Sequence, residues 1–129
     1  MEVKMADIEL IVYNKLHSEL DCRVEIQNFT QEYTGEPVVI VDLVNERVTG
    51  TVELKEWVTK SVTILVDTYT SGNRARMKAV EIYGKIDNVM ENLGFKLDGR
   101  NKTPSFLGKD ITRYSSVYVA SITNENVIF

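Results

Sequence analysis

Residues 62–95 read VTILVDTYTSGNRARMKAVEIYGKIDNVMENLGF and contain the two patterns that decide the fold of this chain. In the first pattern, residues 58–69 alternate between apolar and polar, which places Val62, Ile64 and Val66 on one face of an expected strand. The opposite face carries Thr63, Leu65, Asp67 and Tyr69. A strand of this length is stable only when other strands pair with it, so the pattern predicts a sheet.

The second pattern is a helix from Arg74 to Leu93. Asn73, in the turn before it, is expected to cap its first turn. Gly94 is expected to end the helix in a left-handed conformation that folds Phe95 back toward Met90. Gly84 in the middle is expected to admit the close approach of another backbone. The apolar stripe that should pack on the sheet consists of Ala75, Ala79, Ile82, Ile86, Val89, Met90 and Leu93, with Tyr83 beside it.

Working outward, the same periodicities predict the remaining elements. An amphipathic helix covers Met5 to Glu19, with Ile8, Ile11, Val12, Leu16 and Leu20 on its apolar face. Strands are expected over 22–27, 38–44 and 111–123, with turns at 45–47 and 49–50, an extended piece over 52–57, a long polar loop or arm over 28–37 and a loop over 99–108.

These elements predict an α+β fold. Strands that come in runs, without regular β-α-β alternation, favour a mostly antiparallel mixed sheet. Two main helices should pack against it, with a long loop or β-arm between the strands. A length of 129 residues, 43% of them hydrophobic, suits a single domain over 1–129 with one core.

Composition removes several classes of function. No apolar run reaches the roughly 20 residues of a membrane helix, and we expect neither a membrane span nor a signal peptide. One cysteine, Cys22, lies in an expected strand and is interpreted as a small buried hydrophobe. One histidine, His17, is expected on a helix surface and excludes every two-histidine metal motif. The glycines never cluster into a phosphate-binding loop, so we expect no cofactor, no metal and no catalytic residues.

The charge of −4 is unevenly distributed along the chain. Residues 1–32 carry seven acidic and three basic residues, and residues 33–73 carry six and three. Residues 74–113 reverse the balance with nine basic and five acidic residues. The acidic first half is therefore complementary to the basic segment of another copy, although an ordinary solvated surface also tolerates such a division.

Three cations, Arg74, Arg76 and Lys78, fall in the first turns of the long helix, where they oppose its dipole. We interpret them as candidates for a subunit interface, and a pI of about 5.0 favours acidic side chains of a neighbour over DNA as their partner. Screening by solvent and salt is the alternative. Phe29 and Tyr33, in the polar arm, are further interface candidates. The apolar residues Val127, Ile128 and Phe129 either add to the fold or dock on a partner.

The order of these parts resembles the tail terminator, or tail-completion, proteins of long-tailed bacteriophages. The likeness comes from the N-terminal helix, the strand from Val62 to Tyr69, the helix that ends in Leu93-Gly94-Phe95, and the strand that follows Asp110. It implies a non-catalytic virion protein, assembled in the bacterial cytoplasm, that caps the tail tube as a hexameric ring and ends its polymerisation. The implied partners are other copies of the chain, the tail tube protein and the head-tail connector protein, and DNA passes through the lumen only as cargo.

Two alternatives to a tail terminator stay open at this point. One is a head-completion or connector adaptor of the phage neck. The other, from a different class, is a small non-catalytic regulatory or nucleic-acid-binding module.

Overall fold

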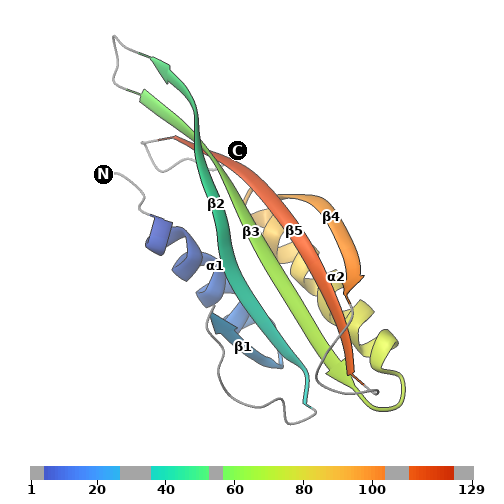
Figure 1. The fold of residues 1–129 in the computed structure, drawn as a ribbon. Coiled ribbons are helices and arrows are strands. Elements are labelled where there is room, and N and C mark those ends of the chain that lie inside the picture. Colours follow the sequence, from blue (N-terminus) through green and yellow to red (C-terminus); the bar gives the residue numbers. More distant parts are fainter. Residues whose placement is uncertain (1–4, 27–35, 53–56, 104–110, 124–129) are drawn as a thin grey trace.

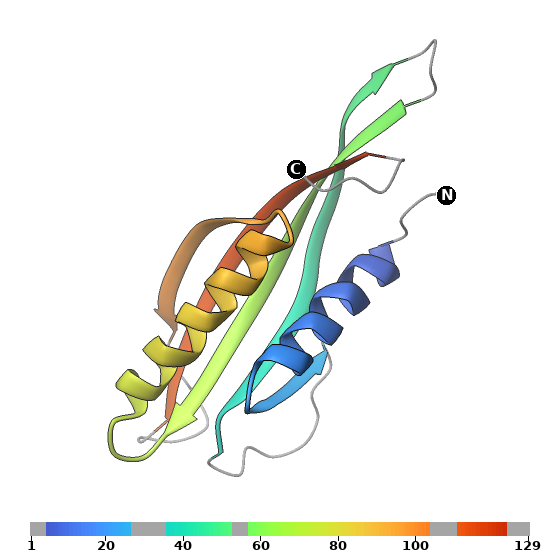
Figure 2. The same ribbon diagram turned by 180° about the vertical axis from the view of Figure 1, so that it is seen from behind.

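The computed structural model of the chain describes residues 5–26, 36–52, 57–103 and 111–123. Five strands form one sheet in the order β1-β2-β3-β5-β4, antiparallel except for the parallel pair β1 and β2. Both helices lie on the same face of this sheet (Figure 1, Figure 2). The expected α+β class is therefore confirmed. In chain order the elements are α1 (Met5–Glu19), β1 (Arg23–Ile26), β2 (Val38–Val52), β3 (Trp57–Ser71), α2 (Ala75–Asn92), β4 (Lys96–Thr103) and β5 (Ile111–Thr123).

The core lies between the sheet and the two helices. On β3, Val62, Ile64 and Val66 are fully buried on the helix-covered face, as their alternation predicts. The same face continues through Thr68 and Thr70, which are also buried. Strand β5 alternates in the same way, because Tyr114, Ser116, Tyr118 and Ala120 are buried while the residues between them are half-buried. Each long strand thus contributes one face to the core.

Helix α2 packs as its periodicity predicts. Ala75, Ala79, Ile86, Val89 and Met90 are buried along one side, and Ile82, Tyr83 and Leu93 pack at the margin of the core. The helix also ends as expected: Gly94 has a φ of 95° and the amide of Phe95 donates to the carbonyl of Met90 at 2.9 Å. The turn buries Phe95, which is 3% exposed.

The start of α2 differs from the prediction. Arg74, not Asn73, occupies the N-cap position, in a left-handed conformation with a φ of 63° and without a side-chain cap. The turn is closed instead by the amide of Ala75, which donates to the carbonyl of Gly72 at 3.2 Å, while the hydroxyl of Thr70 donates to the carbonyl of Ala75 at 2.6 Å.

The prediction that Gly84 admits the close approach of another backbone was also wrong. A Cβ built at Gly84 meets nothing within 4 Å.

Helix α1 has the expected bounds, but its buried face is narrower than expected. Ile8, Val12, Leu16 and Leu20 are buried at steps of four residues. Ile11 lies about 100° around the helix from Val12 and is 43% exposed. The prediction that Ile11 belongs to the buried face of the helix was therefore wrong. His17 is exposed, as predicted, and stacks on Tyr13.

Strand β2 replaces several predicted short pieces. The turns expected at 45–47 and 49–50 are instead two irregularities in one 15-residue strand, between Leu43 and Asn45 and between Val48 and Gly50. Polar residues and glycine in such a stretch give the signals of a turn. The irregularities leave Val44 and Thr49 out of the ladder, while residues 45–48 and 50–52 continue to pair with β3.

Strand β4 is a second correction. Residues 99–103 belong to this strand, although a loop was predicted over 99–108; residues 104–110 lie outside the described part of the chain. An edge strand that pairs with β5 on one side can carry polar residues such as Lys96, Asn101 and Lys102 without alternation, so no periodic signal marks it.

A polar network ties this edge strand to α2 and β5. The Arg100 guanidinium on β4 donates to Ser116 Oγ at 2.8 Å and also to the Asp87 carboxylate on α2. The Tyr118 hydroxyl donates to the same carboxylate, and burial, followed by this hydrogen bond, raises the pKa of Tyr118. Arg100 also lies 3.8 Å from the centre of the Tyr83 ring. The network satisfies polar groups at the border of the core.

The sheet is longer than the helices that cover it. Strands β2 and β3 each have 15 residues, which corresponds to about 50 Å, whereas the 18 residues of α2 span about 27 Å. The end of the sheet where β2 finishes and β3 begins therefore projects beyond both helices (Figure 1, Figure 2).

The packing of α2 makes a direct prediction. Ile86→Ala, at a fully buried position, should lower the free energy of unfolding by about 2–5 kcal/mol, because the truncation leaves a cavity under the helix. Val80→Ala on the exposed side of the same helix is the control and should change it by less than about 0.5 kcal/mol. Urea unfolding measures both, and equal effects would show that the helix packs by another face.

Candidate functional site

The predicted interface cations occupy different places around the start of α2. Arg74, Arg76 and Lys78 are all exposed, as expected. Arg74 belongs to the turn before the helix, and Lys78 Nζ donates back to the carbonyl of Ser71 at 3.4 Å. Arg76 lies about 200° around the helix from Lys78. The three cations therefore do not form one cluster, and Lys78 lines a cleft.

The other predicted site residues cannot be placed in the same way. The structure does not describe the remaining candidates, which are Phe29, Tyr33, Val127, Ile128 and Phe129.

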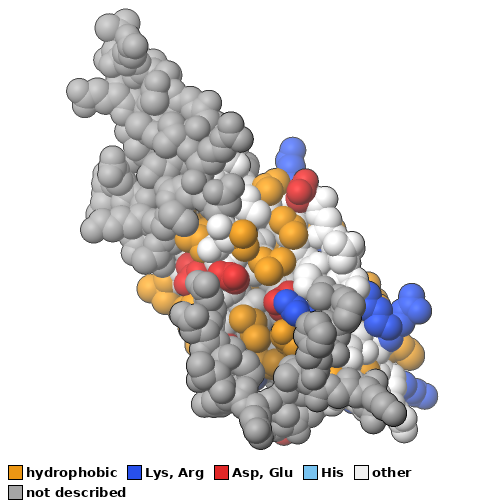
Figure 3. All heavy atoms as spheres, viewed as in Figure 1, with side chains coloured by type: hydrophobic (Ala, Val, Ile, Leu, Met, Phe, Trp, Pro, Cys, Tyr) orange, Lys and Arg blue, Asp and Glu red, His pale blue; other side chains and the backbone are white. Residues whose placement is uncertain are grey.

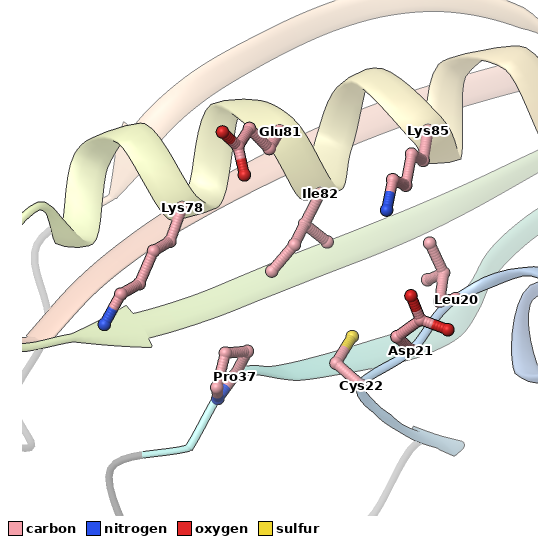
Figure 4. A pocket seen from close by; sticks show the side chains of 8 residues that line it. All are labelled: Leu20, Asp21, Cys22, Pro37, Lys78, Glu81, Ile82 and Lys85. Carbon is pink, nitrogen blue, oxygen red and sulfur yellow. The ribbon is translucent and has the colours of Figure 1, made fainter.

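The cleft beside Lys78 separates α2 from the connection between α1 and β1 and has a volume of about 230 Å³ (Figure 4). Lys78, Ile82 and Lys85 form its α2 wall, since residues four and seven positions apart lie on the same side of a helix. Ile82 points across the cleft toward the opposite wall. The lining residues are Leu20, Asp21, Cys22, Pro37, Lys78, Glu81, Ile82 and Lys85.

The second wall is formed by the residues that follow α1 and by the residue that precedes β2. Leu20 is buried against the core directly after α1, which fixes the turn that presents Asp21 and Cys22 to the cleft. Pro37 precedes β2 and closes the far end. Leu20, Ile82 and Pro37 supply the apolar part of the lining, Lys78, Glu81 and Lys85 supply charges from α2, and Asp21 supplies one from the opposite side.

Cys22 gives the cleft a thiol that stays protonated at neutral pH. It is half-buried rather than fully buried, so the interpretation as a buried hydrophobe holds in part. Burial raises the pKa of the Cys22 thiol, and the charge of Asp21 raises it further, against the opposing effects of a backbone hydrogen bond and Lys85. A protonated thiol is a poor nucleophile, so this environment does not activate the Cys22 sulfur.

The face of the sheet away from the helices holds a second group of polar side chains among apolar ones (Figure 3). Arg113 donates to one oxygen of the Asp67 carboxylate at 3.0 Å, and the Ser115 hydroxyl donates to the other at 2.6 Å. Asp67 is only 7% exposed, so this ion pair between β3 and β5 is largely buried. Its carboxylate is fully engaged by these neighbours, which makes it a structural pair.

Asp42 on β2 is less well satisfied. Its Oδ1 atom is buried and has no hydrogen-bond partner within the described part of the chain. Burial, followed by the negative charges of Glu9 and Asp67, raises the pKa of Asp42. Glu9 itself accepts a hydrogen bond from the amide of Leu43 at 2.9 Å, next to the irregularity in β2.

Within residues 5–26, 36–52, 57–103 and 111–123, no three side chains of the kinds that bind metals come together. Neither of the described helices is long and apolar enough to cross a membrane.

No known family model matches the sequence, and no curated protein matches it. The candidate site is therefore defined by its own geometry.

The sequence interpretation missed most of this cleft. Lys78 was singled out for its place near the helix start, but Lys85, two turns later on the same side, was not. A search for charges seven residues apart could have paired the two lysines. Their meeting with Leu20, Asp21 and Pro37 has no signal in the sequence, because it depends on how α1 and α2 lie beside each other.

The raised pKa of Asp42 predicts a gain in stability on removing its charge. A carboxyl whose pKa is higher in the folded state contributes stability only when protonated, and that contribution is lost as the pH rises through the folded-state pKa. Asp42→Asn should therefore raise the free energy of unfolding at pH 7, and the gain should shrink toward pH 4. Urea unfolding at both pH values measures it, with exposed Asp98→Asn as the control. A loss of stability at pH 7 would contradict the assignment.

The cleft also predicts how Cys22 reacts. At pH 8 a disulfide reagent such as dithionitrobenzoate should modify folded protein more slowly than protein unfolded in urea, because burial lowers the fraction of thiolate and limits access. The unfolded chain carries the same single thiol and is the matched control. Equal rates would place Cys22 outside any enclosed site.

Proposed function

We propose that this chain is a structural subunit that assembles into a ring and acts as a phage tail terminator. In this role it caps the finished tail tube, stops its polymerisation and presents a surface to the head connector. The protein then works without catalytic residues or a cofactor, in the neck of the virion. The resemblance of the sequence to that family motivates the proposal, and the distribution of charge in the fold supports it.

The observation that carries the proposal is the position of the two charge segments in the sheet. The order β1-β2-β3-β5-β4 places the acidic N-terminal part, with β1 and β2, at one edge. It places β4, which carries Lys96, Arg100 and Lys102, at the opposite edge. Copies related by a rotation would bring an acidic edge against a basic edge, and such a heterologous contact closes into a ring when the rotation divides the circle.

The projecting end of the sheet gives independent support. A pair of strands outside its own core is only marginally stable in water, and an additional packing surface stabilises it. In an assembly the neighbouring subunit or the tail tube would supply that surface to the ends of β2 and β3.

Reversal of charge tests the ring contact. Arg74→Glu combined with Arg76→Glu should weaken self-association, because closure of a ring repeats each contact in every subunit. The thermal midpoint of the monomer should stay almost unchanged or rise slightly, since the helix dipole favours acids at its N-terminus. High salt should weaken the wild-type assembly in the same direction. Sedimentation at low and high salt measures the assemblies.

The matched control makes the same change of charge in the acidic half, with Lys15→Glu and Arg23→Glu, both exposed. It should weaken association less than the reversal at α2. Identical distributions of oligomers for all proteins at both salt concentrations would remove Arg74 and Arg76 from the interface. A monomer under every condition, including in the presence of tail tubes, would contradict the terminator itself, and tight salt-sensitive DNA binding by that monomer would favour a nucleic-acid-binding module.

A further inference from the structure

We propose that the cleft between α2 and the α1–β1 connection binds residues 124–129 of a neighbouring copy. This inference rests on the proposed function, because it names one contact of the assembly. It assigns a role to the apolar residues Val127, Ile128 and Phe129 and to the lysines that the cleft brings together.

The chemistry of the two surfaces is complementary. Lys78 and Lys85 are about 10 Å apart along α2 and border the apolar residues Ile82, Leu20 and Pro37 (Figure 4). Asp21 and Glu81 also line the cleft, so the two lysines are the positions at which it can accept a carboxylate. The sequence of 124–129 is NENVIF, in which one acid, Glu125, is followed by three apolar residues. An extended segment of this kind would place its carboxylate at a lysine and its apolar side chains on the apolar residues of the cleft.

The Pro37 end of the cleft is farther from Thr123 than residues 124–129 of the same chain can extend. Thr123, the last residue of β5, pairs with Thr59 on β3, whereas Val38, directly after Pro37, pairs with Tyr69. Ten residue steps along β3 separate these positions, which is about 33 Å. Six residues span at most about 21 Å when fully extended. Residues 124–129 therefore do not reach the Pro37 end of their own cleft.

The same distance fixes the type of contact. The donor segment leaves the projecting end of the sheet, near the start of β3, and the acceptor cleft lies toward the end where β3 finishes. Donor and acceptor are different surfaces of one subunit, so each copy both gives and receives. Such a contact links copies head to tail and adds to the contact between the acidic and basic edges.

A labelled peptide tests the cleft directly. A fluorescent peptide of residues 121–129 is titrated into full-length protein whose own segment is altered by Val127→Ser, Ile128→Ser and Phe129→Ser. We expect saturable binding, weakened about tenfold when Lys78→Glu and Lys85→Glu are added to the receptor. Lys96→Glu with Lys102→Glu, on β4 outside the cleft, is the matched control and should leave the affinity unchanged. A peptide of the same composition in scrambled order should bind weakly.

Exchanging the charges of the peptide and the cleft distinguishes a lost contact from a receptor variant that does not fold. A peptide with Glu125→Lys should bind the wild-type cleft poorly and bind the Lys78→Glu, Lys85→Glu receptor better than the parent peptide does. Cys22 supplies a second readout, because it lines the cleft. Its modification should be slower in assembled wild-type protein than in dilute monomer, and the segment variant should lose this protection.

The outcomes separate this inference from the proposed function. No binding of the peptide, or binding that ignores both the cleft lysines and the order of the sequence, would overturn the inference. Rings that form normally with the altered segment and without protection of Cys22 would also overturn it, while the terminator role would stand. Binding that follows the cleft charges, in a protein that neither forms rings nor caps tubes, would support the contact between copies and overturn the terminator role.

Discussion

Every layer of this protein depends on the pairing and burial of strand β3. It lies between β2 and β5, with both of which it forms long antiparallel ladders, and every second side chain from Val62 to Thr70 faces the helices in the middle of the sheet. Each fully buried aliphatic side chain of this kind contributes about 1.5–3 kcal/mol of hydrophobic stabilisation. The chain then turns at Gly72 from β3 directly into α2, so that α2 packs on the face of the sheet to which β3 contributes (Figure 2).

Hydrophobic burial alone does not determine the strand register or the position of α2, and two ion pairs contribute to both. Asp67 and Arg113 join β3 to β5 on the open face, and Asp87 and Arg100 join α2 to β4 at the edge of the core. A buried pair gains little net energy, because removal of the charges from water offsets their attraction. Loss of one partner is costly, however, since it leaves the other charge without compensation. These pairs are thus expected to select one register and one helix position among packings of similar apolar area.

The candidate functional surfaces arise from the order of the strands. The acidic N-terminal part lies beside the β1 edge and the basic strand β4 forms the opposite edge, and the proposed ring contact uses this separation. The same arrangement separates the end of β5 from the cleft beside α2 by most of the length of the sheet. In the proposed assembly these regions would be the donor and the acceptor of a heterologous contact, which is the kind of contact that closes into a ring.

The sequence by itself determined the elements whose side chains repeat with a clear period. The bounds of α1 and β5, the buried faces of β3 and α2, and the end of α2 at Gly94 all follow from local patterns, because a strand or helix with one buried face needs a period of two or 3.6 residues. Tertiary structure decided the rest. Residues 45–52 became part of β2 because β3 pairs with them beyond the irregularities at Val44 and Thr49, and β4 became a strand because β5 offers it an edge. Likewise, Lys78, Lys85 and Pro37 share one cleft only because the sheet order and the packing of two helices bring distant segments together, and no local period encodes that distance.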